Sequence, residues 1–275
     1  MITNKIQIKR EKMDITLKNK TAIICGSTQG IGYAIAELYW EYGANLILIA
    51  RNESKLIEIK KSFEGNKVDT NQNINYIVAD FDNPEELNSK LQSFSFDKVD
   101  ILINNTGGPN AGMAHTSKIE DYELAFKRHL ICNQILVQNI VEIMKANKFG
   151  RIINIISTSV KQPLDNLGVS NTIRGAVANW SKTLANELGQ FNITVNNILP
   201  GATSTERLEN IIKNKANKIN VESNKVSEEM IGEIPLNRFA EPKEIAYGAL
   251  FLASEMGSYV SGINLPIDGG RLKVL

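Results

Sequence analysis

The sequence predicts an α/β domain of the doubly wound class, in which helices cover both faces of a seven-stranded, mainly parallel sheet. Short apolar segments, each long enough for one buried strand, alternate with segments whose apolar residues recur at helical spacing. Continuously apolar strands separated by helices are typical of parallel sheets that are buried on both faces. The expected strands are residues 21–25, 45–50, 75–79, 100–104, 151–156, 194–199 and 263–267.

The same pattern predicts the domain organisation. Strand and helix patterns alternate to the end of the chain, and no Pro-, Gly- or Ser-rich linker divides it. We therefore expect residues 13–275 to form a single domain. Residues 1–12 are basic and lack apolar periodicity, so we expect a flexible tail there. The polar segment 206–233 has weak apolar spacing, and we expect it to form a lid over the substrate.

The composition excludes several kinds of partner. A formal net charge of +1 gives no indication of a nucleic-acid or acidic-lipid partner. The sequence has no run of about 18 apolar residues, so we expect no membrane span. The two cysteines and two histidines are too scattered to predict a metal site. Two thiols in a chain of 275 residues suit a reducing compartment, and we expect a cytoplasmic protein.

A glycine-rich loop joins the first expected strand to a helix. Its spacing is Gly-x-x-x-Gly-x-Gly, and glycines allow the backbone to turn tightly and to approach a pyrophosphate. A plain strand–helix turn is the other interpretation. The flanking strand and helix favour nucleotide binding and a Rossmann-type fold. The loop residues expected to contact the cofactor are Gly26, Ser27, Thr28, Gln29, Gly30, Ile31 and Gly32.

The residues after the second expected strand distinguish between the two nicotinamide cofactors. An acidic residue here hydrogen-bonds the adenosine ribose of NAD, whereas an arginine receives the extra phosphate of NADP. The chain has Arg51 and Asn52 at this point. Arg51 as one more solvated surface charge is the other interpretation. The position favours the phosphate role, and we expect NADP(H) as the cofactor.

Further motifs follow in a fixed order along the chain. Asn104-Asn105-Thr106-Gly107 follows the fourth expected strand, Asp80 follows the third, and Pro200-Gly201 closes the sixth. With the glycine loop, these motifs make residues 17–270 resemble the short-chain dehydrogenase/reductase family, especially 3-oxoacyl-(acyl carrier protein) reductase relatives. The resemblance implies cofactor contacts from Asp80, Phe81, Asn105, Thr106, Gly107, Pro200, Gly201 and Thr205.

The resemblance also carries an expectation about assembly. Members of the family usually pair through two long helices, which correspond here to residues near 119–145 and 170–189, and through the last strand. We therefore expect a homo-oligomer, either a tetramer or a dimer.

The chain departs from the family at its catalytic positions. The family uses Asn, Ser, Tyr and Lys, and counting along the sequence places Ser157 at the serine. The tyrosine, lysine and asparagine positions are occupied by Ser170, Arg174 and His129. A divergent reductase-like subgroup has Ser-Asn-x-x-Arg, Asn-Asn-x-Gly-Gly-Pro and Pro-Gly-x-x-x-Thr-Glu-Arg motifs. This chain is similar to that subgroup, because it has all three motifs, at residues 170–174, 104–109 and 200–207.

These substitutions change the chemistry of proton transfer. A phenol has an ordinary pKa of about 10, which a neighbouring lysine can lower toward neutrality, whereas a serine hydroxyl is a much weaker acid. Arg174 keeps the positive charge and can hold the nicotinamide ribose, but it stays protonated. Three other proton sources remain open: a water molecule, His129 and Lys161. The other interpretation is that neither residue supplies a proton: His129 is packed inside the fold, and Lys161 is a solvated surface charge.

Two functions fit these observations. The first is an NADP(H)-dependent oxidoreductase that acts on a small ketone or secondary alcohol through an atypical proton path. The second is a catalytically silent NADP(H)-binding sensor or scaffold. Ser157 and the positive charge of Arg174 favour the enzyme, and the missing tyrosine favours the binding protein. Steady oxidation of NADPH with a panel of carbonyl compounds distinguishes them.

Overall fold

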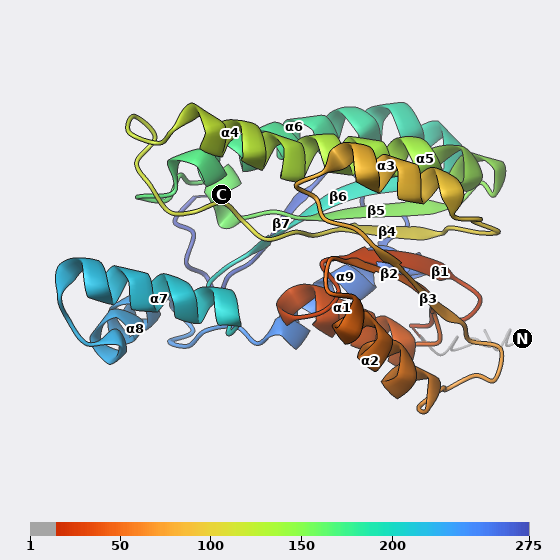
Figure 1. The fold of residues 1–275 in the computed structure, drawn as a ribbon, viewed down its shortest axis with the longest axis horizontal. Coiled ribbons are helices and arrows are strands. Elements are labelled where there is room, and N and C mark those ends of the chain that lie inside the picture. Colours follow the sequence, from red (N-terminus) through yellow and green to blue (C-terminus); the bar gives the residue numbers. More distant parts are fainter. Residues whose placement is uncertain (1–14, 275) are drawn as a thin grey trace, which may run out of the picture.

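The structure, a computed structural model, describes residues 15–274. The expected tail at residues 1–12 lies outside them. A seven-stranded sheet forms the centre, and the strands in spatial order are β3-β2-β1-β4-β5-β6-β7, with every adjacent pair parallel (Figure 1). The predicted fold class is confirmed. The strands are β1 (Thr21–Cys25), β2 (Asn45–Ala50), β3 (Ile74–Val78), β4 (Ile101–Asn104), β5 (Gly150–Ile155), β6 (Ile193–Pro200) and β7 (Asn264–Ile267).

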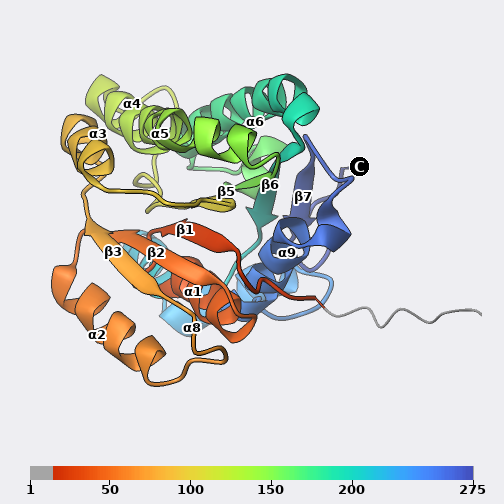
Figure 2. The same ribbon diagram turned by 90° about the vertical axis from the view of Figure 1, so that its right-hand side faces the viewer.

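Helices cover both faces of the sheet. In Figures 1 and 2, α3, α4, α5 and α6 lie on one face, and α1, α2 and α9 lie on the other. The helices are α1 (Gly30–Glu41), α2 (Glu53–Glu64), α3 (Pro84–Ser93), α4 (Ile119–Phe126), the π-helix η1 (Lys127–Ile131), α5 (Cys132–Ala146), α6 (Gly168–Leu188), α7 (Glu206–Ile219), α8 (Ser223–Gly232) and α9 (Pro242–Ala253). Short 3₁₀-helices are η2 (Thr158–Val160), η3 (Gly189–Phe191) and η4 (Glu255–Gly257).

Alternation of side chains divides the interior into two cores. Along β1, Ile24 belongs to the core beneath α1 and α9, whereas Ile23 belongs to the core beneath α3 and α5. Leu48 and Ile49 of β2 divide in the same way. Successive side chains of a strand point to opposite faces, so a continuously apolar strand supplies both cores at once.

A ladder of asparagine side chains crosses four strands. Asn104 donates from Nδ2 to Asn154 Oδ1 at 2.8 Å, and Asn154 donates to Asn197 Oδ1 at 2.9 Å. Asn197 continues the ladder to Asn264 Oδ1 at 2.8 Å. Buried amides need partners, and the register of β4 to β7 places the four asparagines side by side across the sheet. The ladder therefore helps to set the register of β4 to β7, and with it the positions of the loops that leave their carboxyl ends.

The segment expected to form a single long helix near 119–145 is interrupted. α4 ends at Phe126, η1 adds one wider turn, and α5 continues the run to Ala146. A π turn holds one more residue than an α turn, and it is often found at functional sites. This turn carries His129, one of the candidate site residues.

The expected lid segment 206–233 contains two helices that sequence analysis did not predict. α7 and α8 project from the carboxyl end of the sheet (Figure 1). They pack against each other through a small apolar cluster that includes Leu208, Ile212, Ala216 and Val226. The expectation of weak apolar spacing was wrong for α7, because its buried residues Leu208, Ile212 and Ala216 recur at helical spacing within a sequence rich in Lys and Asn.

The order of the strands places a crevice above β1 and β4. The chain runs outward from β1 to β3 and then returns to β4, so the loops after these adjacent strands separate. In open α/β sheets, ligands bind at this point, outside the carboxyl ends of the strands. Within residues 15–274, no helix is long and apolar enough to cross a membrane.

Candidate active site

The glycine loop leaves β1 in a conformation that requires its glycines. Gly26 and Gly30 have φ of 59° and 55°, in the left-handed region. A Cβ on Gly32 would lie 2.1 Å from the Gly26 carbonyl oxygen, so α1 approaches the loop more closely than any side chain permits. Asn105 supports the loop, because its Nδ2 donates to Cys25 O at 3.2 Å and to Gly26 O at 3.4 Å.

The amino terminus of α1 fits the pyrophosphate of a dinucleotide. In the described chain, Gln29 at the N-cap makes no side-chain cap hydrogen bond, and the first turn has no acidic residue. The first N–H groups of the helix therefore remain available, and the positive end of its dipole favours an anion. A Cβ on Gly30 would lie 3.3 Å from Thr205 Cγ2, so the segment after β6 packs closely against the same loop.

The residues after β2 and β3 differ in what they can offer a cofactor. The Arg51 side chain is 74% exposed, and its Nη1 lies 3.9 Å from Asp80 Oδ2, so the guanidinium is held loosely above the carboxyl ends of the strands. Asn52 instead caps α2, because its Oδ1 accepts from Lys55 N at 3.0 Å. Phe81 is buried, and its carbonyl accepts from the Cys132 thiol at 3.4 Å.

Ser157 and Arg174 converge at the carboxyl end of β5. Ser157 is half-buried, and its Oγ accepts from Ser159 N at 3.1 Å as the cap of η2. Because this bond uses the oxygen as an acceptor, the hydroxyl proton remains available to a ligand. Arg174 is 8% exposed and donates from Nη1 to Ile155 O at 2.8 Å. Ser170 is buried one turn earlier on α6.

Arg174 is a buried cation. Burial, and then the charge of Arg207, lower its pKa to about 9, so the guanidinium is still protonated at neutral pH. Its Nε is buried without a hydrogen-bond partner in the part of the chain that the structure describes. The side chain therefore retains a donor that a ligand can use.

His129 is neutral in this environment. It is 2% exposed, and its Nε2 has no hydrogen-bond partner among residues 15–274. Burial lowers its pKa well below the ordinary value, and the charges of Arg174, Arg128 and Arg207 lower it further. The backbone of Gly107 hydrogen-bonds the imidazole and opposes the shift, but it is the smallest of these effects.

The remaining expected residues line the same edge. Thr205 caps α7, because its Oγ1 accepts from Leu208 N at 3.4 Å. Gly201 follows β6 and donates to Ile267 O at 2.9 Å. Gly107 is exposed, and a Cβ there would meet nothing within 4 Å, so the loop after β4 opens toward this space. Lys161 is half-buried just after η2, and it makes no ion pair within residues 15–274.

Comparison with known proteins finds relatives along nearly the whole chain. A family model described as enoyl-(acyl carrier protein) reductase matches residues 26–271. The 3-oxoacyl-(acyl carrier protein) reductase FabG of Rickettsia bellii is 32% identical over 262 residues, which are 94% of this chain and 100% of that protein. The chain belongs to the short-chain dehydrogenase/reductase family.

Two other relatives are described as using or binding NADPH. The NADPH-dependent reductase BacG of Bacillus subtilis is 29% identical over 259 residues, covering 94% of this chain and 99% of BacG. The structure of L-sorbose reductase from Gluconobacter frateurii, complexed with NADPH and L-sorbose, superposes with a TM-score of 0.88 at 31% identity. That match covers 96% of this chain and 100% of the sorbose reductase chain.

One residue of this short-chain reductase fold was not among the predicted site residues. Arg207, in the first turn of α7, donates from Nη1 to Gly108 O at 2.9 Å and from Nη2 to Pro109 O at 3.1 Å. Although the residue as a whole is exposed, its guanidinium is packed against the loop, and this burial lowers its pKa. The sequence signal was present, because two of the three subgroup motifs contain these residues.

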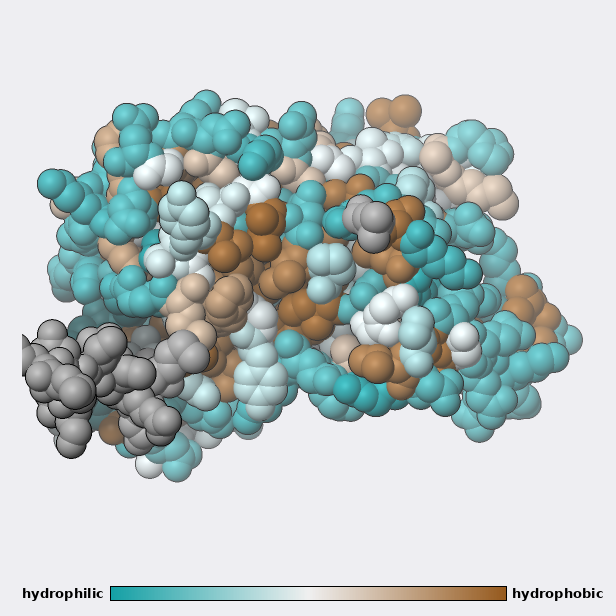
Figure 3. Space-filling view, turned by 180° about the vertical axis from the view of Figure 1, so that it is seen from behind, coloured by the Kyte–Doolittle hydropathy of each residue, from teal (hydrophilic) through white to brown (hydrophobic). Residues whose placement is uncertain are grey.

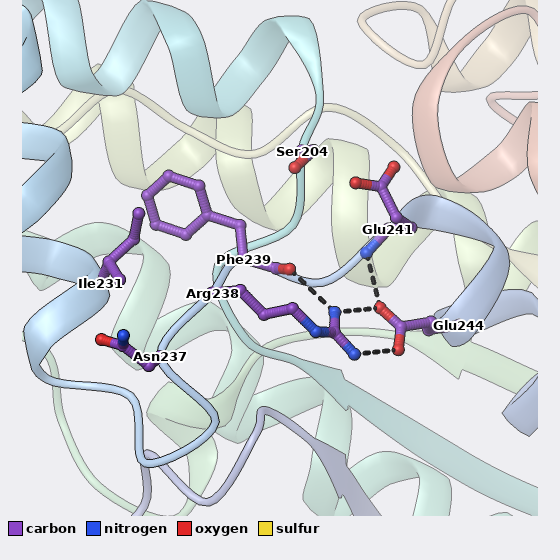
Figure 4. Close-up of a pocket in the computed structure, with 7 residues that line it drawn as sticks. All are labelled: Ser204, Ile231, Asn237, Arg238, Phe239, Glu241 and Glu244. Atoms are coloured by element: carbon purple, nitrogen blue, oxygen red, sulfur yellow. Dashed lines mark hydrogen bonds and ion pairs between the residues drawn. The ribbon is translucent and has the colours of Figure 1, made fainter.

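A surface hollow of about 460 Å³ lies away from these residues (Figure 4). Its wall contains an ion pair in which Arg238 donates to both carboxylate oxygens of Glu244, at 2.6 and 2.7 Å. Arg238 thereby lowers the pKa of Glu244 to about 2. The hollow is lined by Ser204, Ile231, Asn237, Arg238, Phe239, Glu241 and Glu244, and none of the candidate catalytic residues reaches it.

Proposed function

We propose that this protein is an NADP(H)-dependent oxidoreductase that interconverts a ketone and a secondary alcohol. The observation that carries the proposal is the meeting of Ser157 and Arg174 at the same sheet edge as the open glycine loop. The NADPH-dependent relatives support the cofactor, and the sorbose reductase complex supports a small carbonyl substrate.

Each residue then has a defined task. NADPH, when bound, supplies a hydride to the carbonyl carbon. Ser157 donates its hydroxyl proton in a hydrogen bond to the carbonyl oxygen and stabilises the negative charge that develops there. Arg174 holds the nicotinamide ribose through the donors that Ile155 leaves unused. Arg51 receives the 2′-phosphate of the cofactor.

The proton reaches the product oxygen by a path without tyrosine. A neutral, buried His129 has no imidazolium proton to give at neutral pH. A water molecule beside Ser170, or the ammonium group of Lys161, is therefore the source that we propose. Serine is much smaller than the tyrosine that the family has at position 170, and in this proposal the water takes the place of the missing phenol.

The decisive experiment is NADPH oxidation in the presence of ketones, followed by absorbance at saturating cofactor. Steady turnover with any ketone supports the enzyme. If NADPH binds but no carbonyl is reduced, the second candidate holds: a silent NADP(H)-binding sensor or scaffold. The observation that favours the second candidate is the serine at position 170, where the family has its proton-donating tyrosine.

Arg51→Asp should reverse the cofactor preference. The wild-type guanidinium is exposed and only loosely paired, so it is available to the phosphate, whereas aspartate repels the phosphate and accepts from the ribose of NAD. Fluorescence titration should show a loss of NADPH affinity of about tenfold or more, as expected for a charge-assisted pair worth about 1.5–3 kcal/mol. Equal wild-type affinities for NADPH and NADH, or an unchanged preference in the variant, contradict the assignment.

Protonation of His129 should lower the free energy of unfolding in acid. Its pKa is lowered in the folded state, so the unfolded chain takes up the proton first as the pH falls below about 6.5. Its contribution to stability is complete above that pH and decreases below it, by at most about 1.4 kcal/mol for each pH unit. Urea unfolding of wild type and His129→Asn between pH 5 and 8 should show a stability difference that shrinks as the pH falls. A pH-independent difference would mean that the imidazole titrates normally.

We also propose that the protein assembles as a homo-oligomer. Ile119 and Phe126 of α4 are 69% and 40% exposed, and the edge strand β7 is only half-buried. Figure 3 views the molecule from the side of β7 and shows apolar residues gathered at the centre of that face. Exposed apolar patches of this kind mark protein interfaces. Light scattering at micromolar concentration should give a dimer or tetramer, and a monomer contradicts the proposal.

A further inference from the structure

The three motifs that set this chain apart meet in one place. The loop after β4 starts beside the glycine loop at Asn105, passes beneath Arg207 at Gly108, and ends against the beginning of α6. There Gly112 N donates to Asn166 O at 2.7 Å, and Gly168 N donates to Gly112 O at 2.9 Å. The loop therefore joins the cofactor crevice to the helix that carries Ser170 and Arg174.

Arg207 is held in this place by the shape of the loop. The Gly108 and Pro109 carbonyls fix two of its nitrogens, and a guanidinium has five N–H donors, so donors remain. A Cβ on Gly108 would lie 2.6 Å from Arg207 Nη2. Glycine at position 108 is thus the residue that allows the guanidinium to lie flat against the loop, and the backbone at Gly108 does not otherwise demand glycine.

The positive charge here has no carboxylate to balance it. Among the described residues, neither Arg174 nor Arg207 forms an ion pair, whereas the neighbouring Arg128 is neutralised by both oxygens of Asp82. Among the same described residues, Arg174 Nε and His129 Nε2 are buried without hydrogen-bond partners. A buried, unpaired charge is costly, and a site that takes up an anion can offset that cost.

The electrostatics of the three side chains agree with this arrangement. The charge of Arg207 lowers the pKa of Arg174, and both arginines lower the pKa of His129, so all three act on one region. Glu206 and Glu209, in the same turn of α7 as Arg207, are exposed and form no ion pair with it among the described residues. Arg174 and Arg207 therefore keep positive charge that an anion can use.

We propose that Arg207 binds a carboxylate of the substrate, with Arg174 reinforcing the positive field, so that the substrate is an oxo acid and not a neutral ketone. This inference rests on the proposed oxidoreductase function and specifies its substrate class. A carboxylate is planar, and the fork of a guanidinium matches its two oxygens. The phosphates of the cofactor have the same charge, but the glycine loop and Arg51 already provide for them.

The test compares matched substrates that differ only in charge. Small 2-oxo and 3-oxo acids are assayed beside their methyl esters, with NADPH at saturation. A site built to pair with a carboxylate should prefer the acid by about 10²-fold or more in kcat/KM. Binding of the corresponding hydroxy acids and hydroxy esters to the NADP⁺ complex, measured by calorimetry, gives a second readout that needs no turnover.

Three variants isolate Arg207. Arg207→Met removes the charge and keeps much of the stem, and Gly108→Ala displaces the guanidinium without removing the charge. Lys213→Met removes one exposed charge from the same helix and serves as the matched control. Both site variants should lose the preference for acid over ester, with ester turnover and NADP⁺ affinity within about threefold of wild type, and the control should keep the preference.

The outcomes separate this inference from the proposed function. Turnover of esters and acids at equal rates overturns the carboxylate site and leaves the oxidoreductase intact. Hydroxy-acid binding that requires Arg207, without any turnover, supports the site and rejects the oxidoreductase. If Arg207→Met weakens NADP⁺ binding instead, Arg207 serves the phosphates of the cofactor and the inference is wrong.

Discussion

Ser157→Ala should lower the turnover of ketones by about 10- to 10⁴-fold, the range for loss of a positioned polarising group. The Ser157 oxygen accepts from Ser159 N, so its proton points elsewhere and can reach a carbonyl oxygen. The chemical step loses most of its rate, because that hydrogen bond strengthens as negative charge develops on the oxygen. NADPH affinity should stay near the wild-type value, since the hydroxyl has no proposed contact with the cofactor.

The measurement is single-turnover NADPH oxidation, with the affinity for NADPH determined separately by fluorescence. Ser159→Ala is the control, because Ser159 is two residues away in the same turn and its Oγ has no proposed role. A drop in turnover that is equal in the two variants would assign the effect to the 3₁₀ turn η2 and not to the Ser157 hydroxyl.

The fold was predictable because its determinants are local. A strand such as β2 is Asn45 followed by five consecutive apolar residues, and its bounds agree with the expected range 45–50. The caps of α2 and α3 are equally local: Asn52 and Asn83 each accept from a backbone N–H three residues later. α7 has the same local signals, because Thr205 accepts from Leu208 N and the apolar residues recur at helical spacing, but its many Lys and Asn residues led us to expect only weak apolar spacing. Within the described residues, α8 has no side-chain cap and packs against α7 through the same small apolar cluster.

The site was predictable only in part, for a related reason. The glycine loop is contiguous, so its chemistry can be inferred from seven residues. The contact between Arg207 and Gly108 joins positions 99 residues apart, and no periodicity carries that information. The π turn around His129 is likewise invisible to a helical pattern, because the apolar residues on either side keep a helical spacing. The charge state of His129 depends on these tertiary contacts, and the sequence alone therefore left it open as a proton donor.

The second large effect is expected from restoring the usual residues of the family. Ser170 and Arg174 lie one turn apart on α6, so Ser170→Tyr with Arg174→Lys places a phenol beside an ammonium group. The lysine lowers the pKa of the phenol from its ordinary value of about 10, and the phenol supplies the proton directly. If the wild type relies on water or Lys161, ketone reduction should rise by about 10²-fold or more, the usual contribution of a positioned acid.

The matched control is Ser170→Phe with Arg174→Lys, which adds the same ring without the hydroxyl. Ser170 is buried, so both double variants must accommodate a large side chain, and their melting temperatures should fall together. A gain in the tyrosine variant alone therefore reports the acid and not a change in packing. If neither variant reduces ketones and the wild type is also silent while NADPH still binds, the pocket serves binding, because restoring the acid would have been sufficient to restart a reductase whose other groups were in place.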